Sequence, residues 1–492
     1  MHPAHFFDEP LAQQILQISL SLCNESYLVG GSIRDILLGG RQISDLDIAV
    51  EGDGFEIARE VANRLTVKSS FVALDKDRRT GRIVVSEPTN MTVDISSFKG
   101  PDITQDLYHR DFTINSIAVH LWDIISGRVS EAIIDPLGGR EDLKRKIIRM
   151  SSSNSFTEDP LRMLRAFRFS SQLGFDICPE ARLGIEKSAT LIQNVSGERI
   201  RDELEIVFRS NRSAKIVEQM ADTSLLWEIF PELRPSRGFE QNAFHHLDVW
   251  GHTVDALENL ETIIDNLPVF LGPFSEKAFN YICEQPVTGR SRQWLLKLAV
   301  LFHDSGKPFS LHVDENGRRR FIGHEKVSKT LFLVAGARLK LGSRELSEVS
   351  SWIEGHMRPS ILTLGNPSQR AIVRLVHRFG THIMGLVILY LADLLAAKGP
   401  ARDLSDLQRA KHGVRRAIEL FLKEEETPII PLLDGFDMMS EFGLEQGPHL
   451  GSIIRWLVTE QSLGLTRNRE QAKEAIRRYL KQNPVTQKKE RT

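Results

Sequence analysis

The sequence has 492 residues, which is too long for one hydrophobic core, so three or four domains are expected. Hydrophobic residues make up 41% of the chain and charged residues 26%, as in ordinary soluble proteins, and the net charge of −2 excludes an overall basic field for nucleic acid. The three cysteines are scattered, and the first residues lack a signal-peptide pattern. We expect no apolar run to be long enough to cross a bilayer. These features indicate a cytoplasmic protein without membrane contact.

Strand-like and helix-like runs alternate up to about residue 150, which predicts an α+β head. The run "SYLVGG" reads as a strand ending at Gly30-Gly31, and "SIRDILLGG" as a short helix with Ser32 as its N-cap. The run "DLDIAV" is the next strand, "FEIAREVANRL" has helical periodicity, and "GRIVVSE" and "MTVDISSF" resemble the strands of a hairpin. From residue 151 onward, amphipathic helices follow one another, so we expect an all-helical remainder.

Two acids stand one residue apart in the strand-like run "SDLDIAVEG". Side chains alternate along a strand, so Asp45 and Asp47 point to one face, and the apolar residues between and after them point to the other. Like charges this close repel unless a cation joins them, which favours a metal site. A water-exposed strand edge is the simpler interpretation of this stretch alone.

The run "LVGGSIRDILLGG" lies just before these acids. A strand that ends in Gly30 and Gly31 before a helix lets backbone N–H groups approach an anion closely, and Arg34 lies in the first turn. Any tight strand–helix turn can use two glycines. A phosphate cradle followed by two acids on one face, however, is the pairing that a metal-bound triphosphate requires.

Polar groups in "LYHRDFTINSIAV" interrupt a stretch that otherwise looks buried. Arg110 suits a phosphate, and Asp111 and Asn115 suit ribose hydroxyls. A structural Arg–Asp pair beside a helix cap is the alternative. The next polar loop, "IIDPLGGREDL", fits an ordinary Asp/Gly turn.

The run "EDPLRMLRAFRF" predicts a helix that presents an acid and an arginine near its start. Pro160 at the first helical position makes Asp159 a candidate N-cap. Carboxylate and guanidinium have opposite hydrogen-bonding patterns, so Asp159 and Arg162 could read a nucleobase edge. Arg165 and Arg168 continue a basic stripe that could reach phosphates.

Taken in order, "LVGGSIRD…SDLDIAV", "RDFTINSIAV", "DPLGGREDL", "EDPLRMLRAFRF" and "GERIRDELEIVF" resemble five successive motifs of the class II tRNA nucleotidyltransferase and bacterial poly(A) polymerase family. This resemblance covers roughly residues 25–210. It implies a multidomain protein with an α+β head of the DNA polymerase beta type, followed by an all-α neck, an HD-type body and a tail. We place these domains at residues 1–150, 151–215, 216–410 and 411–492.

The resemblance also implies a role for each matching position. Asp45 and Asp47 would bind Mg²⁺. Asp94 lies outside the matched motifs, in the strand-like run "TVDIS", and is a candidate for the third carboxylate of this site. The family usually has two arginines where this chain has His109-Arg110, so one phosphate contact is expected to be weaker or pH-sensitive. The remaining implied roles are triphosphate binding by Gly30, Gly31 and Arg34, phosphate and ribose contact by Arg110 and Asp111, and an amino-acid template of Asp159 and Arg162 that pairs with ATP or CTP.

A second set of candidate ligands lies in the helical half. The adjacent His303-Asp304 follows the apolar run "LLKLAVLF", and imidazole with carboxylate is a transition-metal ligand set. The pattern resembles the HD phosphohydrolase superfamily over residues 245–400, which implies a Ni²⁺, Co²⁺ or Mn²⁺ site. A vestigial domain that grips RNA is the alternative. The full candidate set is His252, His303, Asp304 and Asp393, with His324 and His356 for a second metal.

These observations predict a template-independent enzyme that adds CMP or AMP, as CCA or part of it, to tRNA or other RNA 3′ ends. An enzyme that adds only A or only C, or a poly(A) polymerase, suits the same residues. A hypothesis of another class is an HD-type phosphohydrolase that acts on nucleotides or RNA ends with an inactive head. A third is a pure RNA-binding protein, which would need neither acidic pair.

Overall fold

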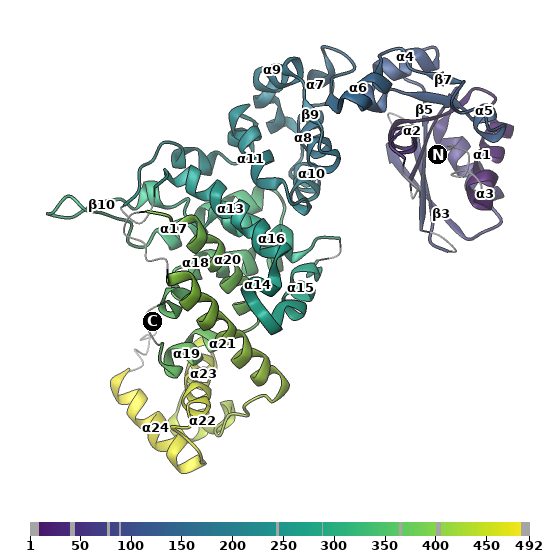
Figure 1. Ribbon diagram of the computed structural model, residues 1–492. Helices are drawn as coiled ribbons and strands as arrows, with labels where there is room; N and C mark the ends of the chain where they lie inside the picture. Colours follow the sequence, from purple (N-terminus) through teal and green to yellow (C-terminus); the bar gives the residue numbers. More distant parts are fainter. Residues whose placement is uncertain are drawn as a thin grey trace, which may run out of the picture. The chain divides into compact units, whose positions relative to one another are not determined.

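The computed structural model describes residues 9–39, 45–75, 79–87, 90–242, 246–287, 289–363, 367–399 and 405–483. The chain forms two compact units (Figure 1). The first contains residues 1–210 and 218–229, and the second contains residues 211–217 and 230–492.

A seven-stranded mixed sheet forms the centre of the head, with strand order β3-β4-β5-β2-β1-β6-β7. Neighbouring strands are antiparallel except β2 and β5, which are parallel. The predicted hairpin of "GRIVVSE" and "MTVDISSF" is confirmed as β4 and β5. The strands are β1 Ser26–Val29, β2 Asp45–Val50, β3 Ser69–Asp75, β4 Thr80–Val85, β5 Met91–Ser97, β6 Ala118–His120 and β7 Ile133–Ile134.

One face of this sheet is covered by helix α3 (Gly54–Arg64). A side chain at Gly81 of β4 would come within 2.6 Å of the Ala58 Cβ atom, so the close approach of α3 requires glycine there. Alternate residues of β4, such as Ile83 and Val85, are buried on the α3 side, and Arg82 lies on the opposite face. The other head helices are α1 Pro10–Leu22, α2 Gly30–Leu37, α4 Ile103–Tyr108, α5 Leu121–Ile125 and α6 Gly139–Arg145.

Helices dominate the chain after the head, but the expectation of an all-helical remainder is wrong in detail. A short parallel pair joins β8 (Ile147–Ile148) to β9 (Asp176–Ile177). A hairpin of β10 (His312–Val313) and β11 (Arg319–Arg320) lies in the second unit. The helices that follow the head are α7 Ser155–Glu158, α8 Leu161–Leu173, α9 Pro179–Ser188, α10 Gly197–Arg209, α11 Ser213–Asp222 and α12 Leu225–Ile229.

Two strongly apolar helices of the second unit, α16 (Arg292–Phe302) and α20 (Ile383–Ala396), pack against each other and against α13 (Val249–Asp265) and α18 (Ser343–Gly355). The last three helices form a separate apolar core that includes Met438, Ile453 and Ile476. The segment Gln369–Ala396, with a mean hydropathy of 1.7, is long and apolar enough to span a membrane, contrary to our expectation from the sequence. Its most apolar part is 72% buried, so we interpret it as a core segment. The helices are α13 Val249–Asp265, α14 Leu267–Leu271, α15 Ser275–Cys283, α16 Arg292–Phe302, α17 His324–Arg338, α18 Ser343–Gly355, α19 Gln369–Phe379, α20 Ile383–Ala396, α21 Asp406–Glu426, α22 Gly435–Phe442, α23 Pro448–Ser462 and α24 Arg469–Gln482.

Candidate active site and a second cluster of metal ligands

Three carboxylates of the head lie on neighbouring strands. Asp45 and Asp47 are on β2, and Asp94 on β5 is in register with Asp47. Burial raises the pKa of Asp47 and Arg110 opposes that rise, whereas the charges of Asp94 and Asp45 add to it. A cation placed among these oxygens would relieve the repulsion, so the donor set fits a divalent metal such as Mg²⁺.

The glycine turn brings backbone N–H groups next to the carboxylates. The Gly31 N–H donates to Asp47 Oδ2 at 3.2 Å. Gly30 has a φ of +67°, and a Cβ atom there would lie 3.0 Å from the same oxygen, so only glycine permits this approach. Helix α2 starts at Gly30, and the prediction of Ser32 as N-cap is wrong. The Ser32 hydroxyl instead donates to the Asp45 carbonyl at 3.0 Å and accepts from the Asp47 N–H at 2.9 Å.

Sequence reasoning missed Asp106, the buried residue that orients Arg110. The Arg110 Nε and Nη2 atoms donate to Asp106 Oδ2 at 3.0 and 2.8 Å. The other oxygen of Asp106 accepts from the Lys99 N–H at 3.0 Å. The two residues are four apart at the end of α4, and this spacing was the available signal.

Asp111 lies in a buried ion pair. The Arg165 guanidinium donates to Asp111 Oδ2 at 2.8 and 2.6 Å, and Asn115 donates to Oδ1 at 2.9 Å. Burial alone would raise the pKa of Asp111, but Arg165 and Asn115 outweigh it and hold the pKa well below its usual range. Asn115 also accepts from Arg34 at 2.8 Å. Asp111 therefore pairs with Arg165 and not with the neighbouring Arg110, which pairs with Asp106. The contact of Asp111 with ribose stays a prediction.

The expected base-reading pair sits at the start of α8. Asp159 accepts from the Leu161 N–H at 3.2 Å, but α8 begins at Leu161 with Pro160 as its N-cap, so the prediction of Asp159 as N-cap is wrong by one residue. The other oxygen of Asp159 pairs with Arg199 at 3.2 Å. Arg162 is buried and donates to the His109 carbonyl at 2.7 Å. The pair is therefore held in fixed positions before any nucleotide binds.

The arginines further along α8 have partners within the protein. Arg168 pairs with Glu203 of α10 at 3.3 Å, and Arg165 lies 3.7 Å from the same carboxylate. Arg165 and Arg168, together with Arg34, also lie over the Phe169 ring, with centroid distances of 5.5, 4.5 and 5.1 Å. These contacts brace α8 against α10 and the head. Arg165 also lines the head cleft, and contact of Arg165 and Arg168 with phosphates stays a prediction.

One cleft of about 310 Å³ connects Asp47 and Asp94 with the residues at the start of α8. It is large enough for part of a nucleotide and is open at one side. The side chains that line it carry both charges. Among them are Asp47, Asp94, Lys99, Asp106, His109, Arg110, Asp111, Asp159, Arg162, Arg165 and Arg199.

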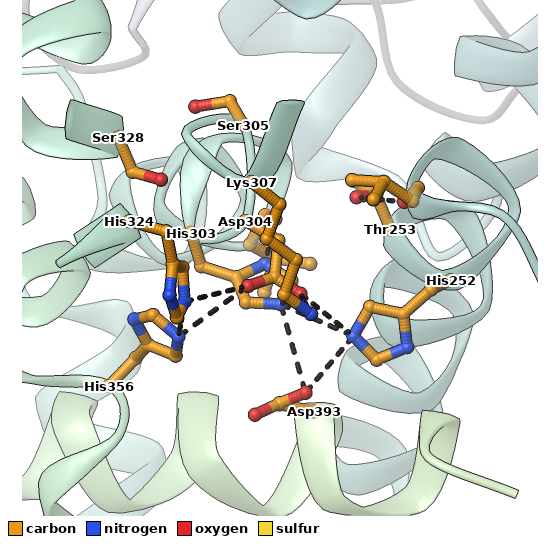
Figure 2. Close-up of polar contacts among 12 residues, drawn as sticks. His252, Thr253, His303, Asp304, Ser305, Lys307, His324, Ser328, His356 and Asp393 are labelled. Atoms are coloured by element: carbon orange, nitrogen blue, oxygen red, sulfur yellow. Dashed lines mark hydrogen bonds and ion pairs between the residues drawn. The ribbon is translucent and has the colours of Figure 1, made fainter. Parts of the chain in front are cut away.

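The second unit brings all six residues predicted for the second metal site into one cluster (Figure 2). Asp304 lies at its centre. One Asp304 oxygen is 3.2 Å from His303 Nε2 and 3.4 Å from His252 Nε2, and the other is 3.2 Å from His324 Nε2. His356 and Asp393 complete the two groups, which are His252, His303, Asp304 and Asp393, and Asp304, His324 and His356.

Hydrogen bonds fix the direction of three of these imidazoles. Each donates Nδ1–H to a backbone carbonyl three residues earlier in the chain, which directs Nε2 into the cluster. The pairs are His303 with Val300 at 2.7 Å, His324 with Phe321 at 2.7 Å and His356 with Ile353 at 2.8 Å. This buried set of nitrogen and carboxylate ligands fits one or two transition-metal ions.

Charges within the cluster already compensate one another. Burial lowers the pKa of His303, but Asp304 and Asp393 outweigh it and raise that pKa to about 10. The Lys307 ammonium lies 2.6 Å from Asp304. A cavity of about 460 Å³ opens onto the cluster, lined by Asn242, Asp304, Lys307, Arg319, Arg320, Phe321, Ile322, His324, His356, Met357, Ser360, Thr363, Tyr390, Asp393, Leu394 and Ala397.

Family comparisons match three parts of the chain. Residues 26–149 match the poly A polymerase head domain, residues 174–236 match the probable RNA and SrmB-binding site of polymerase A, and residues 249–398 match the HD domain. The fold is similar to the apo CCA-adding enzyme, with a TM-score of 0.60 and 21% identity over 95% of this chain and 93% of that one. It is also similar to the Thermotoga maritima CCA-adding enzyme solved with tRNA, with a TM-score of 0.57, 20% identity and 96% of each chain covered.

Curated relatives cover nearly the whole length. The A-adding tRNA nucleotidyltransferase of Deinococcus radiodurans is 32% identical over 93% of this chain and 96% of its own. The CC-adding tRNA nucleotidyltransferase of Thermus thermophilus is 30% identical over 91% of this chain and 92% of its own. The resemblance drawn from the five motifs is thereby confirmed, and this chain belongs to the tRNA nucleotidyltransferase family.

Proposed function

We propose that this protein adds AMP or CMP to the 3′ end of tRNA, with the head cleft as the active site. The observation that carries the proposal is that one cleft is lined both by Asp47 and Asp94 and by Asp159 and Arg162. A nucleotide bound there would place its phosphates beside the carboxylates and its base beside α8. The head, neck, body and tail boundaries at 150, 215 and 410 and a cytoplasmic location remain parts of this proposal.

The chemistry assigns each residue a task. The RNA 3′-hydroxyl attacks the α-phosphorus and gives up its proton to solvent, a new P–O bond forms, and the bond to the departing pyrophosphate breaks. Mg²⁺ held by Asp45 and Asp47, with Asp94 as the third carboxylate, would supply the charge stabilisation that this displacement needs. Gly30, Gly31, Arg34 and Arg110 would hold the triphosphate, Asp111 and Asn115 the ribose, and Asp159 and Arg162 the base.

The nucleotide that is added and the RNA that accepts it distinguish an A-adding enzyme, a C-adding enzyme and a poly(A) polymerase. The relatives include A-adding and CC-adding enzymes at similar identity, and an Asp–Arg template suits both bases. We would assay tRNAs that end before, within and one residue short of CCA, with ATP and CTP supplied separately. Addition of a single A to the last of these identifies an A-adding enzyme, and long A runs on any RNA identify a poly(A) polymerase.

The head site is tested by Asp45→Ala and Asp47→Ala. Each removes a carboxylate that would hold the metal, so addition is expected to fall about a thousandfold or more while the protein still folds. Radiolabelled nucleotide incorporation measures the activity, and circular dichroism checks the fold. Near-normal addition by either variant would contradict the proposal, as would metal-independent behaviour, which a pure RNA-binding protein predicts.

A second activity is supported by the completeness of the His/Asp cluster. We propose metal-dependent hydrolysis of a phosphoester, such as a 2′,3′-cyclic phosphate at an RNA end. Water forms a new bond to phosphorus, and one ribose oxygen leaves and takes up a proton. Six ligand side chains and an adjoining cavity favour this activity over a vestigial domain.

The second activity needs a separate measurement. Purified protein with Mn²⁺, Co²⁺ or Ni²⁺ is expected to open the cyclic phosphate, and Asp304→Asn is expected to abolish this reaction because both ligand groups lose a shared member. Nucleotide addition by the same variant should persist. Absence of both bound metal and hydrolysis with all three ions would refute the second activity and leave the first untouched.

A further inference from the structure

A cationic side chain stands in the same row of the head sheet as two of its carboxylates. Antiparallel register places Arg82 of β4 opposite Asp94 of β5, and parallel register places Asp94 beside Asp47 of β2. Residues in register on adjacent strands carry their side chains on the same face. The three side chains therefore form a row of one positive and two negative charges on the face of the sheet opposite α3.

Arg82 engages both oxygens of Asp94. Its Nε donates to Oδ1 and its Nη2 donates to Oδ2, each at 2.7 Å. Hydrogen bonds with Asp94 raise the pKa of Arg82, burial opposes the rise, and the charges of Asp45 and Asp47 add to it. The guanidinium is thus the positive charge that faces all three carboxylates from β4.

We propose that Arg82 is a positioning residue that takes the place of a metal ion beside Asp94 in the nucleotide-free head, and that Asp94 joins the metal site only when Arg82 releases it. The inference rests on the proposed function of the head. A bidentate guanidinium occupies the Asp94 oxygens, and its positive charge repels an incoming dication.

The exposure of Arg82 makes such a release feasible. Its side chain is 39% exposed, compared with 24% for Asp94, so it can leave without unpacking the core. An incoming triphosphate offers the guanidinium another anionic partner, and the metal ion carried by that triphosphate takes over Asp94. Metal and nucleotide would then bind with positive coupling, which limits metal occupancy of an empty head.

The test measures Mn²⁺ binding in the absence of nucleotide, by electron paramagnetic resonance. The protein is preloaded with Zn²⁺, which imidazole ligands hold more tightly than Mn²⁺, so that the His/Asp cluster does not contribute. Arg82→Ala is expected to bind Mn²⁺ about two- to tenfold more tightly, as expected for loss of a partly exposed ion pair that competes with the metal. The Mn²⁺ affinity of Arg82→Lys should lie between those of the unmodified protein and Arg82→Ala, because lysine keeps the charge and loses the bidentate contact.

Two further variants make the result specific. Arg64→Ala removes the same charge from an ion pair with Glu60 on α3 and should leave Mn²⁺ affinity unchanged. Adding Asp94→Asn to Arg82→Ala should abolish the gain, because the released carboxylate is then gone. Unchanged or weaker Mn²⁺ binding by both Arg82 variants, or an equal gain in Arg64→Ala, would overturn the inference. A protein that binds Mn²⁺ as described but adds no nucleotide would contradict the proposed function alone.

Discussion

Four acids of the head cleft are each held by an arginine. Most of these arginines come from another element, and the contacts are short enough to count as charge-assisted hydrogen bonds or close ion pairs. When a nucleotide binds to such a cleft, an arginine can leave its acid and pair with a phosphate. How readily each arginine does so depends on how exposed it is. The pairs are Asp94 with Arg82, Asp106 with Arg110, Asp111 with Arg165 and Asp159 with Arg199.

Asp106 is the residue whose effect on nucleotide binding is most sharply testable. Asp106→Asn keeps a carbonyl oxygen for the Lys99 N–H but loses the charge that fixes Arg110. We expect the KM for ATP or CTP to rise about tenfold, with a smaller change in kcat, because a charged hydrogen bond contributes about 1.5–3 kcal/mol. Steady-state pyrophosphate release measures both constants.

A matched control comes from the same domain. Asp123→Asn removes the charge from another Asp–Arg pair, with Arg128 at 2.9 Å, and neither residue lines the cleft. It should leave KM unchanged. Equal effects of the two substitutions would show that Asp106 acts through stability of the head and not through Arg110.

At the scale of elements, periodicity predicted four strands of the head sheet, β1, β2, β4 and β5, but it missed β3, β6 and β7 and did not predict the partners of charged side chains. Alternation in "DLDIAV" correctly separated Asp45 and Asp47 from the buried face of β2. It could not show that Ser32 bonds across to β2, because a hydroxyl at the start of a helix looks locally like an N-cap. The three-residue spacing of Arg165 and Arg168 was read correctly as one stripe, but spacing carries no information about Glu203, which lies far along the chain.

In the helical half, too, local patterns in the sequence did not show which distant residues come together. Its His and Asp residues are dispersed over more than a hundred positions, and only the resemblance to a known pattern gathered them from the sequence. The structure brings them together because each stands at the end of a helix or on its inner face, at His303 after α16, His324 at the start of α17 and Asp393 within α20. We expected no apolar run able to cross a bilayer, and the segment Gln369–Ala396 corrects this expectation. Its most apolar part is 72% buried, because a core segment can be as apolar as a membrane span.

At the scale of the whole molecule, two candidate metal sites lie in different units and use different ligand chemistry. The head offers carboxylate oxygens on a sheet, which suit Mg²⁺, whereas the second unit offers imidazole nitrogens and carboxylates, which suit transition metals. A ligand that binds only the folded state stabilises the unit that holds it. Each metal ion should therefore stabilise the unit that binds it.

We expect Ni²⁺ added to metal-stripped protein to protect the second unit from unfolding and to leave the head nearly unchanged. At a metal concentration about 100 times the Kd, the free energy of unfolding of the second unit increases by about 2.7 kcal/mol. This increase corresponds to a shift of roughly 5–10 °C in Tm for a unit of this size. Calorimetry would measure the shift, and hydrogen exchange would locate it on α16 and α17, which carry or adjoin His303, Asp304 and His324. Asp304→Asn should abolish most of the shift, while Asp45→Asn should keep it, because Asp45 lies in the other unit. A shift that survives Asp304→Asn, or protection that appears on β2 and β5 instead, would place the tight transition-metal site outside the His/Asp cluster.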